Sequence, residues 1–95
     1  MNLEQLRAFK PQILAIAEKK NAYNVRVFGS VARGEATEDS DVDLLVTLKP
    51  EASLFDLGGL NYYISELLNT KVDVVPDNSI RKRLEPIILA EALPL

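Results

Sequence analysis

The sequence contains no cysteine and no histidine. The absence of cysteine excludes disulfide bonds and thiolate metal sites. The absence of histidine removes the commonest general base and the commonest ligand of transition metals. Any catalysis by this chain must therefore use carboxylates, hydroxyl groups, lysine, arginine or a hard metal ion.

Positive charge is also scarce, and long apolar runs are missing. The chain has 11 Lys and Arg against 14 Asp and Glu, which gives a net charge of −3. Because sequence-independent binding of nucleic acid needs a basic face, we expect no direct nucleic-acid binding. No apolar stretch approaches the roughly 20 residues that span a bilayer, and residues 1–12 lack the pattern of a signal peptide. These features predict a cytoplasmic protein without a membrane segment.

The length of 95 residues predicts a single domain, residues 1–95, of ordinary globular composition. Apolar periodicity and turn signals predict helices and strands that follow one another along the chain. Ser53 and Asp56 have the spacing of a capping box, and Asn21 suits a helix end. The pattern indicates one small α+β domain with a mixed three-stranded sheet and helices packed on it. The expected helices cover residues 3–9, 11–20, 53–69 and most of 77–93, with a short turn at 30–36, and the expected strands cover 24–28, 41–48 and 71–76.

Three aspartates lie in the predicted strands. Side chains alternate between the two faces of a strand, so Asp41 and Asp43 point the same way. Asp73 stands among valines in the third strand, and it meets the other two acids if these strands are neighbours. Carboxylates that close together repel one another unless a cation lies between them. They suit Mg²⁺, and two such ions could stabilise the attacking and leaving oxygens of a phosphoryl displacement.

A glycine-serine turn, Gly29-Ser30, follows the first predicted strand. Exposed backbone N–H groups at such a turn can hold phosphate oxygens, and the serine hydroxyl adds another donor. The turn and the acids together therefore predict a site for a nucleoside triphosphate and its metal.

A known signature consists of a Gly-Ser pair, ten further residues and then Asp-x-Asp. This chain matches it with Gly29-Ser30 and, after ten further residues, Asp41-Val42-Asp43. With "GSVARG", "SDVDLLV" and "KVDVV", the chain resembles the minimal nucleotidyltransferases of the DNA polymerase β superfamily. The resemblance implies the polymerase β-like nucleotidyltransferase fold. It also implies that Asp41 and Asp43 bind Mg²⁺, that Asp73 completes the metal site and helps to activate the attacking hydroxyl, and that Gly29 and Ser30 hold the β- and γ-phosphates of ATP. Arg33 matches the arginine of the family, which contacts the nucleotide or orients the acidic loop.

Short members of this kind are similar to the antitoxin half of bacterial HEPN/MNT toxin–antitoxin pairs. That resemblance implies transfer of AMP from ATP to a tyrosine of a cognate HEPN ribonuclease, which is thereby silenced. The apolar end of the chain, "PIILAEALPL", is expected to leave surface for this partner.

Other interpretations remain open at this point. The antitoxin could block its toxin by steric cover alone, or the enzyme could modify a small molecule or an RNA end. Asp41 and Asp43 could be the solvated edge of a strand, and Arg33 could be a surface cation paired with Glu35 or Asp39.

Overall fold

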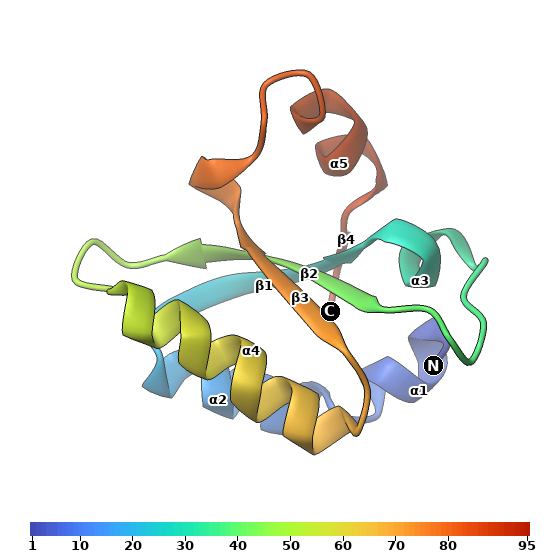
Figure 1. Cartoon of the computed structure of the whole chain (residues 1–95), viewed down its shortest axis with the longest axis horizontal. Helices are drawn as coiled ribbons and strands as arrows, with labels where there is room; N and C mark the ends of the chain where they lie inside the picture. Colours follow the sequence, from blue (N-terminus) through green and yellow to red (C-terminus); the bar gives the residue numbers. More distant parts are fainter.

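A four-stranded sheet forms the middle layer of the computed structural model, which describes all 95 residues (Figure 1). Its strands are β1 (Ala22–Phe28), β2 (Val42–Leu48), β3 (Val72–Pro76) and β4 (Leu93–Pro94), in the order β3-β2-β1-β4. β2 is parallel to β3 and antiparallel to β1, and β4 pairs antiparallel with β1. The α+β class and the mixed sheet are confirmed, whereas the expected number of strands is wrong.

The fourth strand lies in a segment that we expected to be helical up to residue 93. β4 has only two residues, one of which is Pro94, so the sequence has no alternating pattern that would predict a strand there. Leu93 pairs with Val27, and the N–H of Leu95 donates to the carbonyl of Val25 at 3.1 Å. Leu95 is buried. Residues 93–95 therefore complete the sheet and are not free for a partner. Ile87 and Leu89, in the earlier part of the same apolar stretch, are exposed as we expected, at 60% and 47%.

Three helices cover one face of the sheet: α1 (Leu3–Arg7), α2 (Lys10–Lys19) and α4 (Leu54–Leu68). Figure 1 shows α2 and α4 side by side beneath the strands. Their apolar sides meet the inward side chains of the sheet, and removal of this surface from water is the main stabilising contribution. The fully buried side chains of the resulting core include Leu6, Ile13, Val27, Leu44, Val46, Leu60 and Ile64.

Local sequence signals set the ends of α2 and α4 as predicted. Asn21 follows α2 with a φ of 58°, the left-handed conformation that asparagine tolerates. The Ser53 hydroxyl accepts from the N–H of Asp56, and the Asp56 carboxylate accepts from the N–H of Ser53 at 3.0 Å. The bond from Ser53, and then the bond from the Asn21 side chain, lower the pKa of Asp56.

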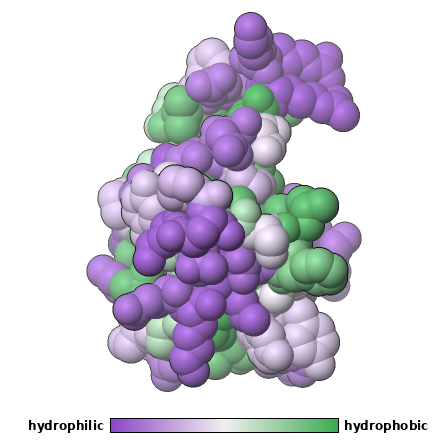
Figure 2. All heavy atoms as spheres, turned by 90° about the vertical axis from the view of Figure 1, so that its left-hand side faces the viewer, coloured by the Kyte–Doolittle hydropathy of each residue, from purple (hydrophilic) through white to green (hydrophobic).

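The other face of the sheet carries α3 (Gly29–Arg33), the short 3₁₀ helix η1 (Asp77–Ser79) and α5 (Glu85–Glu91). Figure 1 shows α5 on the side of the sheet opposite to α2 and α4. We call residues 77–92 the C-terminal arm. Its middle is exposed at Arg81, Lys82 and Arg83, and Figure 2 shows a hydrophilic tip at the top of the molecule. No helix in the structure has the length and apolar character that crossing a membrane requires.

Candidate active site

Asp43 and Asp73 lie opposite each other on the parallel strands β2 and β3. Val42 and Leu44, the neighbours of Asp43, are fully buried in the core on the other side of the sheet. Asp43 is half-buried and Asp73 is exposed. Paired residues of adjacent strands are about 5 Å apart and point to the same face, so the two carboxylates share one small region. The alternation of polar and apolar residues predicted that both acids face away from the core, and the pairing of β2 with β3 brings them together.

The environment of Asp43 disfavours its negative charge. Burial makes the largest contribution and raises the pKa of the carboxyl above its usual value. The negative charges of Asp73, Asp41 and Glu91 raise the pKa further, while Arg33 opposes them. A cation placed among these carboxylates would relieve their repulsion.

Asp41 lies one residue before β2 and points partly toward solvent. Its Oδ2 is 3.7 Å from Nζ of Lys71, and 44% of its side chain is exposed. No three acidic side chains of the chain form a group that is arranged to hold a metal ion. The structure therefore pairs Asp43 with Asp73. Asp41 affects Asp43 through its negative charge, which raises the pKa of Asp43.

The donor chemistry of this region nevertheless fits a hard divalent cation. Asp41, Asp43 and Asp73 offer only carboxylate oxygens, which are the ligands that Mg²⁺ prefers, and none of the three is fully buried. Mg²⁺ also commonly keeps several waters and binds substrate phosphates, so it does not need a complete cage of protein ligands.

Gly29 lies directly against the carboxylate of Asp43. A β-carbon on residue 29 would overlap Oδ2 of Asp43 and would lie 3.1 Å from its Cγ. The residue also has a φ of +75°, a conformation that residues with a side chain rarely adopt. Glycine is therefore required here for two reasons, and the glycine-serine turn lies against Asp43.

The first turn of α3 is joined to the C-terminal arm by a residue that the sequence analysis missed. The N–H of Gly29 donates to Oε1 of Glu91 at 3.0 Å. The hydroxyl of Ser30 makes no hydrogen bond within the chain, and its side chain is half-buried. Glu91 stands alone in an apolar stretch, so only its position in the folded chain identifies it.

Arg33 lies at the end of α3 and pairs with two acids. Its Nη1 is 3.0 Å from Oε2 of Glu91, and its Nε is 3.2 Å from Oε2 of Glu35. These bonds, first to Glu91 and then to Glu35, raise the pKa of the guanidinium. The predicted pairing with Glu35 is confirmed, whereas Asp39 takes no part. With 45% of its side chain exposed, Arg33 still borders open solvent.

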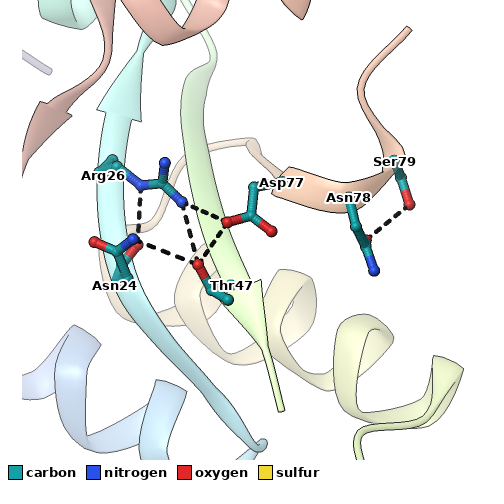
Figure 3. A network of polar contacts seen from close by, with 6 residues as sticks. All are labelled: Asn24, Arg26, Thr47, Asp77, Asn78 and Ser79. Carbon is teal, nitrogen blue, oxygen red and sulfur yellow. Dashed lines mark hydrogen bonds and ion pairs between the residues drawn. The ribbon is translucent and has the colours of Figure 1, made fainter. Parts of the chain in front are cut away.

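A polar network on the same face of the sheet anchors the start of the arm (Figure 3). Oδ2 of Asp77 accepts from Nη2 of Arg26 at 2.9 Å and from the hydroxyl of Thr47 at 2.6 Å. Arg26 also donates from Nε to the carbonyl of Asn24 at 3.1 Å. The network ties β1 and β2 to η1, which immediately follows the strand that carries Asp73.

The acidic pair lies on open surface. The two hollows of the molecule lie elsewhere, and the smaller, of about 330 Å³, is lined by Ile16, Lys19, Lys20 and Tyr63. Neither hollow includes Asp43 or Asp73, so the chain does not enclose an acceptor beside these acids.

Comparisons with known proteins agree on the family of this chain. Residues 10–95 match the family described as "Nucleotidyltransferase domain". A candidate protein adenylyltransferase of Methanocaldococcus jannaschii is 40% identical over 93 residues, which are 98% of this chain and 97% of that protein. The protein adenylyltransferase MntA of Thermococcus cleftensis is 37% identical over 78 residues, which are 82% of this chain and 79% of that protein.

Solved structures show the same fold. A candidate minimal nucleotidyltransferase superposes with a TM-score of 0.89 at 45% identity, covering 100% of this chain and 97% of that one. A chain of a toxin–antitoxin structure with AMP-PNP superposes with a TM-score of 0.76 at 18% identity, covering 90% of this chain and 70% of that one. The chain therefore belongs to the nucleotidyltransferase domain family and is a nucleotidyltransferase enzyme.

Proposed function

We propose that this nucleotidyltransferase is a metal-dependent protein adenylyltransferase and the antitoxin of a toxin–antitoxin pair. It transfers AMP from ATP to a tyrosine hydroxyl of a cognate HEPN-type ribonuclease toxin. The observation that carries the proposal is the pairing of Asp43 with Asp73 beside the turn at Gly29. Because ATP is the donor, we place the reaction in the cytoplasm.

Each residue of the site has a role in this proposal. Asp41, Asp43 and Asp73 would hold Mg²⁺, and the ion would neutralise charge on the phosphates of ATP. Ser30 offers a hydroxyl without a partner in the chain, and it directly follows Gly29, which lies against Asp43. Arg33 adds positive charge at the rim of the site, where the triphosphate is expected.

The reaction is a displacement at phosphorus. The oxygen of the tyrosine hydroxyl forms a bond to the α-phosphorus of ATP, and the bond between that phosphorus and the oxygen bridging to the β-phosphate breaks. Pyrophosphate leaves with this bonding pair. Asp73, the exposed acid of the pair, accepts the proton of the hydroxyl. The products are adenylylated tyrosine and pyrophosphate.

The open position of the site supports an acceptor that belongs to another molecule. Asp73 is exposed, and neither hollow of the surface adjoins it. The names of the relatives support a protein as the acceptor, since they are described as protein adenylyltransferases. The toxin–antitoxin structures of the same fold support a toxin as the partner.

The test uses ATP labelled in two positions. The chain, its partner and Mg²⁺ are incubated with ATP labelled at the α-phosphate or at the γ-phosphate, and the label on the partner is measured. We expect α-label but no γ-label on the partner, and none after EDTA or with Asp43→Asn. The Asp39→Asn variant alters an exposed acid of the preceding loop and serves as the matched control, with normal transfer.

Other outcomes would select the alternatives. Partner silencing that persists in Asp43→Asn without any transfer of label would identify a steric antitoxin. Label that appears on an RNA end or a small molecule, and not on the partner, would identify a different acceptor.

A further inference from the structure

Glu91 contacts the candidate site with both of its carboxylate oxygens. Oε1 accepts from the N–H of Gly29, and Oε2 accepts from Nη1 of Arg33, each at 3.0 Å. Only 20% of the side chain is exposed, although glutamate is normally a surface residue. One residue at the end of α5 thus holds both ends of α3, the first residue and the last.

Beside these two bonds, other donor groups of α3 have no partner in the chain. Gly29 is buried, and Glu91 satisfies its N–H, while the hydroxyl of Ser30 is without a partner. Arg33 uses Nη1 and Nε for its two acids, and Nη2 has no partner in the chain. The hydroxyl of Ser30 and Nη2 of Arg33 are therefore available to phosphate oxygens, whereas the N–H of Gly29 is occupied by Glu91.

Arg33 contacts two carboxylates, and that of Glu91 is the less exposed of the two. The other partner, Glu35, belongs to the loop after α3, and 65% of the Glu35 side chain is exposed. An exposed ion pair holds a long side chain weakly, because the chain loses rotamer freedom for little gain. Without Glu91, the guanidinium would be tied to this loop alone, and the N–H of Gly29 would lose its acceptor.

We infer that Glu91 is a positioning residue of the transfer reaction, which fixes the Gly29-Ser30 turn and the Arg33 guanidinium in the orientation that receives the triphosphate. This inference rests on the proposed function, and it adds that the C-terminal arm is part of the nucleotide site. Residues that orient metal ligands commonly matter by a factor of about 10 to 100 in affinity or activity, and we expect an effect of the same order from Glu91.

Three variants separate the two contacts of Glu91. Glu91→Ala removes both. Glu91→Gln keeps an amide oxygen for the N–H of Gly29 but removes the charge that pairs with Arg33. Glu85→Gln changes an exposed glutamate of the same helix whose side chain makes no hydrogen bond or ion pair, and it is the matched control.

The measurements are the Kd of AMP-PNP with Mg²⁺ by calorimetry, KM and kcat of AMP transfer, and the melting temperature. We expect Glu91→Ala to raise Kd and KM by about tenfold or more, Glu91→Gln to raise them less, and Glu85→Gln to match the wild type. If Glu91→Ala does not fold, Glu91→Gln decides by the same readouts. If the wild type transfers nothing, the proposed function fails, and the calorimetric Kd still tests Glu91.

Two results would overturn the inference. A lower melting temperature with unchanged Kd, KM and kcat would make Glu91 a structural link only. Tighter binding of AMP-PNP by Glu91→Ala would mean that the carboxylate competes with the phosphates for Arg33 and Gly29.

Discussion

The backbone of Gly29 packs against the carboxylate of Asp43 so closely that no side chain fits between them. Two motifs that are separate in the sequence, the glycine-serine turn and the acidic strand, therefore form one contact. The glycine fixes where the carboxylate lies, and the carboxylate explains why the residue is glycine.

Gly29→Ala should disrupt the site more than backbone strain alone explains. Gly34 is the matched control, because it has the same φ of +75° but nothing within 4 Å of a β-carbon. Gly34→Ala should cost about 1 kcal/mol of unfolding free energy, the cost of a left-handed alanine. Gly29→Ala should cost more, because the Asp43 side chain must also move, and it should abolish AMP transfer. Chemical denaturation and the transfer assay measure both effects, and equal losses in the two variants would refute the contact.

Asp43→Asn should stabilise the metal-free protein at neutral pH. Burial and neighbouring acids raise the pKa of Asp43, so the folded state binds this proton more tightly than the unfolded state does. Its contribution to stability therefore falls as pH rises from the usual aspartate value near 3.8 through the raised value. The advantage of the variant should vanish below that window. Thermal melts in EDTA from pH 3 to 7 measure it, and a variant that melts well below wild type at pH 7 would make Asp43 a structural acceptor.

Asp56→Asn should show the opposite pH dependence. Its bonds to Ser53 and Asn21 lower the pKa of the folded state, so the charged form adds stability above the usual aspartate value. That contribution is lost as pH falls through the lowered pKa. The variant should therefore melt below wild type at pH 7 and close to it at pH 2. A constant difference across this range would show that the charge of Asp56 is not what stabilises α4.

The Arg26–Asp77 pair should be energetically coupled. Only 16% and 28% of their side chains are exposed, so removal of one partner leaves a poorly solvated charge. Arg26→Met should cost about 1–3 kcal/mol of unfolding free energy. A double-mutant cycle with Asp77→Asn should give a coupling energy of at least about 0.5 kcal/mol. Arg81→Met, on the exposed part of the arm, should change stability by less than about 0.5 kcal/mol, and a coupling energy near zero would contradict the network.

Local signals in the sequence were sufficient for several parts of the molecule. The alternation around Asp43 and Asp73 placed both acids on the solvent side of strands, because their valine and leucine neighbours must reach the core. The capping box at Ser53 and the left-handed Asn21 fixed helix ends, because each acts within a few residues of chain. The family signature, which lies between Gly29 and Asp43, indicated nucleotidyl transfer.

Tertiary structure decided the remainder. The register that sets Asp43 opposite Asp73 depends on two strands that are far apart in the chain, and a slip by one residue would turn an acid into the core. β4 exists only because β1 offers an unpaired edge, since its two residues carry no strand pattern of their own. Glu91 reaches the site because α5 returns over α3, a contact between residues 62 positions apart. Periodicity reports on a residue and its near neighbours, whereas these contacts are fixed by which surfaces meet when the core closes.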